Sequence, residues 1–558
     1  MIRALAVLML ISATGASAEL RGGVVFEDRD GDGVRSRSEP GVPGVVVARG
    51  SVLVRSDAEG RYEFPANESV EDETAVRATQ FVVLTRPGGY DAERWYRAEA
   101  GDFALQRRAP DGDRFVFAQI SDAHISDRAA DYAHFAVPSA IAKMPRWLSG
   151  VSIGLMFSFQ DPHYDKRRAT DALREELGPY RDVEDWCGAS VRGEWIRRIA
   201  AIREGDENPP IDPAGDFQAS LDELRAVAPR FVVSTGDLVL ESNDGDAESV
   251  DRWMRFYRER TRATDLSFYD TIGNNEIAGS DNPEFEPGQP GYGKALFRSH
   301  FGPTHYSFDR GGLHFIALDT HALLDVEDED WRFKQLDPAV EAWLESDLAM
   351  HAGRPIVVLN HEPLGGDPEW SWLIRKLSLV DDEVTDGLER AGVRWTLAGH
   401  LHVNGLLESG GTQHITTGAF SGMRWSFPSD VLARGYRLFQ FSDGELYSIW
   451  KRTGEAVFDF VDPPGNPLSF ATAPIEERAE TSGRRVVVAA ADRAGAFAVL
   501  RARLGGEPIA VDAWSAYFGA IHYDPAALAP GEHELVFEAV RADGSGLRIN
   551  TLVEGTGR

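Results

Sequence analysis

The sequence predicts an α/β fold with its functional residues at the carboxyl ends of the strands, flanked on both sides by all-β segments. Short apolar runs rich in β-branched residues, typical of buried strands, occur at 114–120, 231–235, 355–359 and 393–398. Each run is closely followed by aspartate, asparagine or histidine. In open α/β sheets, residues just beyond neighbouring strand ends meet at one edge. The pattern therefore predicts one polar site at a sheet edge.

Five short motifs contain the polar residues of this predicted site. In chain order they are Asp122-Ala123-His124, Gly236-Asp237, Gly273-Asn274-Asn275-Glu276, Asn360-His361-Glu362 and Gly399-His400-Leu401-His402. Imidazole, carboxylate and amide groups together are the ligands of a two-metal hydrolytic centre. Any one motif also occurs as buried structural residues, but all of them in this order favour a shared site. Because no cysteine belongs to the set, a Cys-rich structural zinc site is excluded.

With these motifs, the segment from about 114 to 450 resembles the calcineurin-like metallophosphoesterases, and 301–308 and 314–319 are similar to that family's middle strands. The resemblance implies a four-layer α/β/β/α sandwich as the catalytic domain, at 113–453. It also implies a residue set for two metal ions. Asp122, His124 and His402 would hold the first metal, Asn274, His361 and His400 the second, and Asp237 would bridge them.

The resemblance implies a dinuclear metal-dependent phosphoric ester hydrolase acting on a small-molecule substrate. A hydroxide bridging the metals would attack phosphorus, and the cations would stabilise the developing negative charge. The ligand types suit Mn, Zn or Fe, and the general order of metal affinities does not select among them.

One departure from the family pattern concerns the leaving group. The family usually has a histidine after the asparagine of the third motif, where this chain has Asn275. An amide cannot act as a general acid near neutral pH. We therefore expect Asn275 to be a catalytic residue that cannot protonate the leaving group. The enzyme should then prefer a substrate with a phosphodiester or pyrophosphate-type bond. Alternatively, His163 or His305 compensates, or Asn275 donates a hydrogen bond to the leaving oxygen.

A second departure separates the chain from the purple acid phosphatases, because Leu240 stands where that group has a metal-binding tyrosine. Two other functions remain open. One is a phosphomonoesterase, and the other is a cell-surface binding protein with an inactive phosphoesterase scaffold. The complete set of expected ligands argues against the inactive scaffold.

The ends of the chain predict export and two further domains. Residues 1–18 have a charged start, a short apolar core and small residues at 16–18, which is typical of a signal peptide, so we expect a secreted or periplasmic protein. That apolar core is too short to span a membrane. Residues 455–558 contain short strand-like runs after a proline-rich linker and predict a C-terminal β-sandwich without a coherent catalytic set.

The segment 19–108 predicts an N-terminal β-sandwich with a calcium loop. Its acidic residues match the D-x-D-x-D-G-x5-E pattern, in which alternate oxygens and a closing glutamate surround the ion. They are Asp28, Asp30, Asp32 and Glu39. A strand, not a helix, precedes the loop, and the segment resembles the calcium-binding B-type repeats of bacterial surface proteins. The alternative is a solvated turn rich in aspartate and glycine.

A long insertion at about 128–215 predicts a lid or a small subdomain. Its apolar part, 147–159, has three alternative interpretations. It is a buried core segment of the insertion, a wall that contacts an apolar group of the substrate, or a membrane-surface contact. We expect His163 in the insertion to bind substrate close to the metals, and Arg424 and Trp425 in a later loop to pair with a phosphate and stack on a base or sugar. The alternative is that His163 is a loop histidine and that Arg424 and Trp425 belong to a packed surface loop.

Charge and cysteine content exclude some properties. The formal net charge is −31, which disfavours binding to a nucleic acid polymer. Cys187 is the only cysteine, so no intramolecular disulfide forms. The sequence does not predict an oligomeric state.

Overall fold

The computed structural model describes most of the chain outside the predicted insertion. The described ranges are 22–50, 52–65, 81–85, 89–91, 95–97, 101–128, 131, 213–243, 245–280, 282, 284–325, 330–333, 335–364, 382–400, 404–421, 434–461, 484–491, 497 and 499–557. The predicted signal peptide, the apolar stretch 147–159 and Cys187 lie outside these residues. The chain divides into two compact units, Met1–Ala109 and Pro110–Arg558.

The described part of the first unit consists of two four-stranded sheets, ordered β4-β1-β8-β6 and β3-β2-β5-β7. The strands are β1 (Gly22–Glu27), β2 (Val46–Arg49), β3 (Val52–Arg55), β4 (Arg61–Glu63), β5 (Phe81–Thr85), β6 (Tyr90–Asp91), β7 (Trp95–Arg97) and β8 (Phe103–Arg107). Apolar side chains of both sheets, such as Val25 and Phe103 from one and Val47 and Val82 from the other, form one buried cluster. The two sheets therefore pack face to face.

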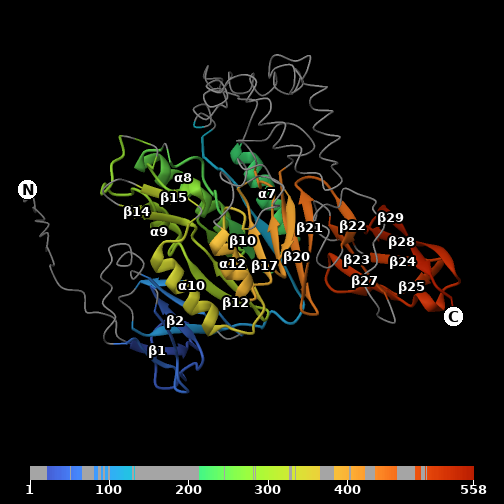
Figure 1. Ribbon diagram of the computed structural model, residues 1–558, viewed down its shortest axis with the longest axis horizontal. Coiled ribbons are helices and arrows are strands. Elements are labelled where there is room, and N and C mark those ends of the chain that lie inside the picture. Colours follow the sequence, from blue (N-terminus) through green and yellow to red (C-terminus); the bar gives the residue numbers. More distant parts are fainter. Residues whose placement is uncertain are drawn as a thin grey trace, which may run out of the picture. The chain divides into compact units, whose positions relative to one another are not determined.

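The second unit contains a five-stranded sheet, β11-β10-β9-β20-β21, and a six-stranded sheet, β12-β13-β16-β17-β19-β18 (Figure 1). The first comprises β9 (Phe115–Ile120), β10 (Val232–Thr235), β11 (Phe268–Thr271), β20 (Gly435–Ser442) and β21 (Glu445–Arg452). The second comprises β12 (Tyr306–Arg310), β13 (Leu313–Ala317), β16 (Ile356–Leu359), β17 (Trp395–Ala398), β18 (Gly405–Ser409) and β19 (Thr412–Thr416). A separate hairpin pairs β14 (His321–Asp325) with β15 (Asp330–Phe333).

Parallel pairing within both sheets places the motif-bearing strand ends together. Strand β10 runs parallel to both β9 and β11. In the other sheet β16 runs parallel to β13 and to β17. Because side chains beyond the carboxyl ends of parallel neighbours share an edge, the motifs after β9, β10, β16 and β17 can converge.

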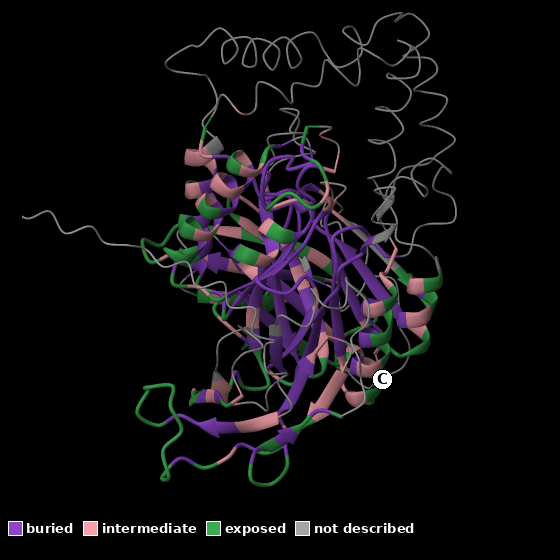
Figure 2. Ribbon diagram, turned by 90° about the vertical axis from the view of Figure 1, so that its left-hand side faces the viewer, coloured by how far each residue is buried: buried purple, intermediate pink, exposed green. Residues whose placement is uncertain are grey.

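An aromatic core joins the two sheets. The ring of Phe117 in β9 stacks on Phe439 of β20 at 4.9 Å and meets Phe315 of β13 edge-on at 5.6 Å between centroids. Phe231, just before β10, also meets Phe315 edge-on, at 5.5 Å. These offset and edge-on contacts are the preferred geometries of aromatic pairs. Figure 2 shows the buried strands at the centre of the unit.

Helices cover the outer faces of these sheets. They are α7 (Pro213–Val227), α8 (Ala247–Arg262), α9 (Ala295–Phe301), α10 (Pro338–Met350) and α12 (Asp382–Arg390), with the short 3-10 helices η2 (Asn274–Glu276) and η3 (Pro525–Ala527). Helix α8 begins after Asp246, whose side chain accepts a hydrogen bond from the Ser249 amide and caps the first turn. Its apolar face, including Trp253 and Tyr257, joins the buried cluster of the five-stranded sheet.

The last part of the chain forms two further four-stranded sheets, β22-β23-β27-β26 and β25-β24-β28-β29. Their strands are β22 (Val457–Val461), β23 (Arg484–Ala491), β24 (Val499–Leu504), β25 (Glu507–Ile509), β26 (Asp512–Ala513), β27 (Phe518–Tyr523), β28 (Gly531–Val540) and β29 (Gly546–Gly555). Phe518 and Val487 belong to the same cluster as α7, and the Tyr517 hydroxyl donates to the Val227 carbonyl at 2.6 Å. These strands therefore pack directly on the α/β part.

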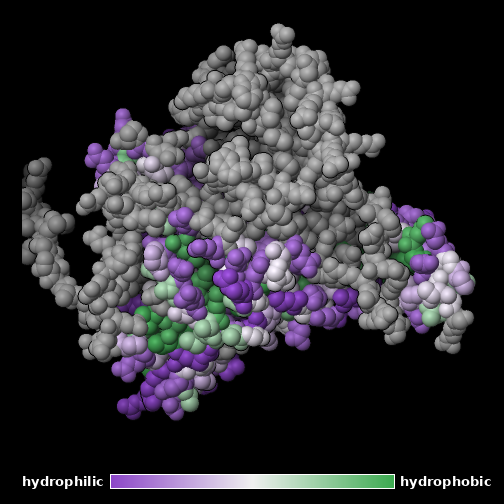
Figure 3. Space-filling view, viewed as in Figure 1, coloured by the Kyte–Doolittle hydropathy of each residue, from purple (hydrophilic) through white to green (hydrophobic). Residues whose placement is uncertain are grey.

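On the face shown in Figure 3, hydrophilic side chains alternate with smaller groups of apolar ones among the coloured residues. Among the described residues, no helix has the length and apolarity needed to cross a bilayer.

Candidate metal centre

Four of the predicted ligands share an unusual backbone conformation. Asp122, His124, Asp237 and His400 have positive φ angles of 52°, 44°, 51° and 65°. Residues other than glycine rarely adopt this left-handed region, and such strain concentrates at functional sites. Each lies within four residues of a strand end, where the chain must turn sharply to direct a short side chain back over the sheet edge.

Asp237 lies at the centre of the described ligands. One of its oxygens, Oδ2, is 3.1 Å from Nε2 of His361 and 3.6 Å from Nε2 of His124. Asp122, His124 and Asp237 form one close group, and Asp237, His361 and His400 form another. Asp237 is therefore the carboxylate common to both groups, as a bridging ligand would be.

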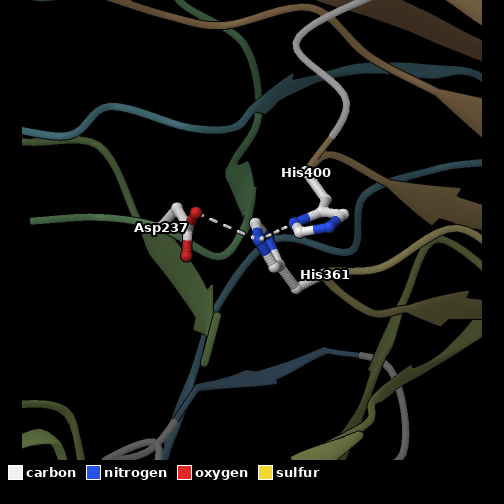
Figure 4. A group of neighbouring side chains, drawn as sticks. All are labelled: Asp237, His361 and His400. Carbon is white, nitrogen blue, oxygen red and sulfur yellow. Dashed lines mark hydrogen bonds and ion pairs between the residues drawn. The ribbon is translucent and has the colours of Figure 1, made fainter. Parts of the chain in front are cut away.

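His361 lies between Asp237 and His400 (Figure 4). Its Nε2 atom is 3.0 Å from Oδ1 of Asn274 and 3.2 Å from Nδ1 of His400. Its other nitrogen, Nδ1, is 2.8 Å from the carbonyl oxygen of Thr235 and donates to it. This bond fixes the ring and leaves Nε2 as the atom directed at the site, as in many metal centres.

A glycine permits this placement of His361. Gly236 has a φ of +88°, and a Cβ atom there would lie 2.6 Å from Nδ1 of His361. Any side chain at this position would push the imidazole away from the Thr235 carbonyl. The glycine before Asp237 therefore has a direct role in the geometry of the site.

The spacings around His361 fit a metal ion bound by these atoms. Two atoms bound at ~2.1 Å to one tetrahedral or octahedral ion lie about 3.0 to 3.4 Å apart. The spacings from Nε2 of His361 to Asn274, Asp237 and His400 are 3.0, 3.1 and 3.2 Å. The His124 spacings are wider, 3.6 Å to Asp237 and 3.9 Å to Asp122.

Asp122 also anchors the loop that carries His400. Both of its carboxylate oxygens accept the backbone N–H of His400 at 3.0 Å. The contact joins the end of β9 to the end of β17, so one side chain links the first motif to the last. His402 lies outside the described residues, as do His163, Arg424 and Trp425.

Asn275 is buried between predicted ligands. Its side chain is 1% exposed. Its Oδ1 accepts from Nδ2 of Asn274 at 2.8 Å, and its Nδ2 lies 3.0 Å from Nδ1 of His124. Its backbone N–H donates to Oδ1 of Asp237 at 2.9 Å. Asn275 thus contacts the ligands of both predicted metal positions.

Glu276 was part of a motif, but the sequence analysis assigned it no role. Its two oxygens accept four backbone N–H groups, those of Gly273, Asp237, Leu238 and Val239, at 2.7 to 3.1 Å. Complete burial and repulsion by Asp237 raise the pKa of Glu276. The residue ties the turn after β11 to the turn after β10, and its only sequence signal was its place in the motif.

Glu362 and His321 form a second contact that sequence reasoning missed. Glu362 follows His361, and its carboxylate accepts from Oγ1 of Thr320 at 2.6 Å and lies 2.8 Å from Nε2 of His321. All three side chains are buried. This contact ties the chain after β13 to the strand end that carries His361.

Without a metal, Asp237 and His361 carry opposite charges. Burial would lower the pKa of His361, but attraction by Asp237 outweighs burial and raises that pKa well above its ordinary value, so a metal binding at Nε2 of His361 would displace a proton. Burial would raise the pKa of Asp237, but attraction by His361 and His124 outweighs burial and holds that pKa below its ordinary value. Burial, together with repulsion by His361, lowers the pKa of His400 to about 4. His400 is therefore neutral at physiological pH and keeps a lone pair for coordination.

Two other positions named from sequence lie elsewhere. His305 packs against Trp343 of α10 at 4.9 Å between ring centroids and takes no part in the described contacts of the predicted ligands. Compensation for Asn275 by His305 therefore has no support in the described geometry. Leu240 is fully buried in the apolar cluster of the five-stranded sheet.

The N-terminal loop brings its acidic residues together. Asp28, Asp30 and Asp32 form one close group. Both Asp28 oxygens accept backbone N–H groups, from Gly31 at 2.7 Å and Gly33 at 3.1 Å. Glu39 accepts from the amides of Arg29 and Ser36 at 2.9 and 2.7 Å, which closes the loop.

Comparison with known proteins identifies the class of the protein. A family model described as calcineurin-like phosphoesterase matches residues 116–404, more than half of the chain. All predicted metal ligands lie inside that span. The class is that of the metal-dependent phosphoester hydrolases. Within that class, the chain belongs to the calcineurin-like phosphoesterase family.

Similar solved structures include a Plasmodium protein, GAP50, described as the anchor in the inner membrane complex, with 13% identity and a TM-score of 0.30 over 61% of this chain and 85% of that one. The purple acid phosphatase PPD1 of yellow lupin has 11% identity and a TM-score of 0.33 over 74% of this chain and 67% of that one. Zinc-complexed Vps29 of Entamoeba histolytica has 15% identity and a TM-score of 0.21 over 44% of this chain and 86% of that one. No curated protein matches the sequence.

Proposed function

We propose that the protein is an exported, dinuclear phosphoesterase that hydrolyses a small phosphoric ester, preferentially a phosphodiester or a pyrophosphate-type bond. The observation that supports this best is the position of Asp237, whose Oδ2 lies between His361 at 3.1 Å and His124 at 3.6 Å. A carboxylate shared by two ligand groups offsets the repulsion between two cations. The family supports phosphoester hydrolysis, and the proposal adds the number of metals and the substrate preference.

The residues of the centre have separable tasks in this proposal. Asp122, His124, Asp237, Asn274, His361 and His400, with His402 as the remaining expected ligand, would hold two ions of Mn, Zn or Fe. Bound there, the metals would supply Lewis acidity and an activated water for attack on phosphorus. The Thr235 carbonyl keeps His361 in the tautomer that presents Nε2. Asp122 holds the His400 loop against the end of β9.

The preference for good leaving groups rests on Asn275. Its amide lies where the family usually has a histidine, and both ends of that amide already contact Asn274 and His124. It has no titratable proton to give to an alkoxide. A nucleotide, pyrophosphate or activated diester leaves without protonation, so such substrates need no acid at this position.

The test compares an aryl phosphate monoester with an aryl phosphodiester on metal-stripped protein reloaded separately with Mn, Zn and Fe. We expect turnover only with metal, faster cleavage of the diester, and loss of activity in Asp237→Ala and His361→Ala. Faster monoester cleavage would overturn the substrate preference and indicate a phosphomonoesterase. No turnover with any metal would overturn the proposal that the protein is an enzyme and would favour a binding protein with an inactive scaffold.

The architecture around the centre completes the proposal. The catalytic part would be a four-layer α/β/β/α sandwich at 113–453, flanked by β-sandwich domains at 19–108 and 455–558. The packing of α8 on the five-stranded sheet and the aromatic contacts between the sheets support the layers. Calcium in the loop of Asp28 and Glu39 would stabilise the N-terminal domain. Export would place the mature protein in the periplasm or outside the cell, and N-terminal sequencing of the secreted protein would test cleavage after Ala18.

A further inference from the structure

A buried arginine lies in the interior between the two sheets of the α/β part. Arg437 of β20 is 1% exposed. Its guanidinium donates to three neutral oxygens: Oγ1 of Thr417 at 3.2 Å, Oγ of Ser448 at 3.2 Å and Oδ1 of Asn404 at 2.8 Å. Among the described residues, no carboxylate pairs with it. Burial lowers the pKa of Arg437 to about 10, so the group stays protonated at neutral pH.

Burying a charge without an ionic partner is costly, so such a residue is retained where its hydrogen bonds have a task. A guanidinium offers five N–H donors in a fixed planar fork, which suits it to hold several oxygens in one arrangement. The oxygens of Asn404 and Thr417 that Arg437 binds begin two branches of a hydrogen-bond network.

One branch of the arginine network reaches Asn404, which lies immediately before β18 and four residues after the predicted ligand His400 in the chain. Its Oδ1 accepts from Arg437 and from the backbone N–H of Gly418 at 3.3 Å. Asn404 is thus held from β20 and from the chain after β19.

The other branch of the network crosses to the remaining ligand strands through Gln119. Oγ1 of Thr417 accepts from Arg437 and donates to Oε1 of Gln119 at 2.7 Å. The Gln119 amide nitrogen donates to the Ala398 carbonyl and to Oγ1 of Thr235, both at 3.0 Å. Ala398 comes two residues before His400, and Thr235 comes two residues before Asp237.

The network therefore spans the strand ends that carry predicted ligands. Gln119 sets the distance between the ends of β10 and β17. Thr235 takes part through two atoms. Its hydroxyl oxygen accepts a hydrogen bond from Gln119, and its backbone carbonyl oxygen accepts one from Nδ1 of His361 at 2.8 Å. A change in the network would move His361, Asp237 and the loop of His400 relative to one another.

We infer that Arg437, with Thr417 and Gln119, is a positioning residue of the metal centre: through Thr417 and Gln119 it sets the spacing of the strand ends that carry Asp237 and His400, and it holds Asn404, four residues after His400 in the chain. The inference rests on the proposed dinuclear function. None of the three residues touches the substrate in this arrangement, and their effect reaches the metals through the ends of the ligand strands. Residues that orient ligands in this way typically change metal affinity or activity about 10- to 100-fold when replaced.

Conservative substitutions test the two branches separately. Thr417→Val keeps the shape of the side chain and breaks the link between Arg437 and Gln119. Asn404→Ala breaks the contact of Arg437 at position 404, and Asn404→Asp restores an acceptor oxygen there. Tyr436→Phe is the matched control, because Tyr436 lies next to Arg437 on β20 but donates its one hydroxyl bond to Glu223 of α7 at 3.0 Å.

The measurements on the full chain are Mn²⁺ binding by calorimetry, kcat and KM for an aryl phosphodiester, and the unfolding temperature of the metal-free protein. We expect Thr417→Val and Asn404→Ala to weaken Mn²⁺ binding and to lower kcat about tenfold each. Asn404→Asp and Tyr436→Phe should remain within about twofold of the wild type, although Tyr436→Phe loses a comparable buried hydrogen bond.

Two outcomes overturn the inference in different ways. If Thr417→Val and Asn404→Ala bind Mn²⁺ and turn over substrate as the wild type does, and lose only thermal stability, the network is purely structural and the dinuclear function stands. If the wild type itself binds no Mn²⁺ and has no activity, the proposed function fails and the positioning role fails with it.

Discussion

Nδ2 of Asn275 lies 3.0 Å from Nδ1 of His124, and both side chains are buried. Because Oδ1 of the same amide accepts from Asn274, the amide spans the two predicted metal positions. Asn275 therefore has a positioning role that does not depend on contact with a leaving group. A histidine in its place would have to adopt a different set of contacts.

This relationship predicts the result of restoring the family residue. Asn275→His should raise monoesterase activity relative to diesterase activity, because a titratable group can then protonate an alkoxide leaving oxygen. The change should lie in kcat and amount to about 10²-fold or less in the ratio of the two activities. Steady-state kinetics with aryl and alkyl phosphates measure it, with Asn275→Ala as the control that removes the contacts without adding an acid. An unchanged ratio contradicts the leaving-group argument.

Glu276 has no direct role in the proposed chemistry, but we expect it to contribute to the free energy of unfolding. Glu276→Gln replaces one acceptor oxygen with an N–H₂ group that faces backbone donors, so up to two of the four amides lose their partner. An unsatisfied buried donor costs roughly 1 to 3 kcal/mol, so we expect a loss of about 3 kcal/mol in the free energy of unfolding. Urea unfolding of the metal-free chain measures it. A loss below about 1 kcal/mol would show that the turns hold without these bonds.

A second buried cluster, which contains none of the predicted ligands, predicts a pH dependence of stability. His314 of β13 is fully buried, with Nδ1 2.8 Å from Asp309 and Nε2 2.7 Å from Asp347 of α10. Arg354 pairs with Asp309 at 2.6 Å, and the ring of His351 stacks on His314 at 3.8 Å. Stacked rings direct their lone pairs in parallel planes, so the two histidines do not converge on one ion. A protonated His314 between two carboxylates explains the distances.

The direction of the pH effect follows from these contacts. Burial lowers the pKa of His314, but the hydrogen bonds that His314 donates to Asp309 and Asp347 outweigh burial and raise that pKa above its usual value. For Asp347 the effects have the opposite sign. Burial raises the pKa of its carboxyl group, but the hydrogen bonds with His314 and His351 outweigh burial and hold that pKa below its ordinary value. The contribution of Asp347 is lost as the pH falls below about 4, and that of His314 declines as the pH rises above about 6.5.

The experiment for this cluster is urea unfolding of the wild type and His314→Gln between pH 5 and pH 9. The stability difference between them should be largest near pH 5 to 6 and should shrink as the pH rises through the folded-state pKa of His314. Comparing the two proteins cancels the titration of the metal centre, which both contain. A difference that is constant with pH would show that His314 is neutral and contributes only by packing.

Calcium removal should affect the N-terminal unit without affecting turnover. We expect dialysis into calcium-free buffer that contains the reloaded metal, Mn or Zn, to lower the unfolding temperature of residues 19–108. Asp30→Asn together with Glu39→Gln should abolish the calcium dependence of that temperature. Calorimetric scans of the full chain with and without calcium provide the measurement. An unchanged scan would indicate a solvated turn, the alternative reading of this loop.

Much of the strand layout and the grouping of motifs followed from local patterns. The apolar runs at 355–359 and 393–398 coincide with β16 (Ile356–Leu359) and β17 (Trp395–Ala398). The reason is that burial on both faces of a parallel strand requires a continuous apolar run, which is visible in a short window of sequence. The flanking motifs were visible for the same reason, because each lies immediately after such a run.

The contacts that connect the motifs were decided by the tertiary structure. Gln119 and Arg437 are paired neighbours on β9 and β20 although more than 300 residues separate them. The four amides on Glu276 and the place of Asn275 between Asn274 and His124 likewise depend on how separate strand ends meet. Which residue types follow each strand can be read from the amino-acid sequence, because that information is local. Which side chains lie together at the site, which hold them in place and which pack in the core depends on the fold, because these relationships are distances between residues far apart in the chain.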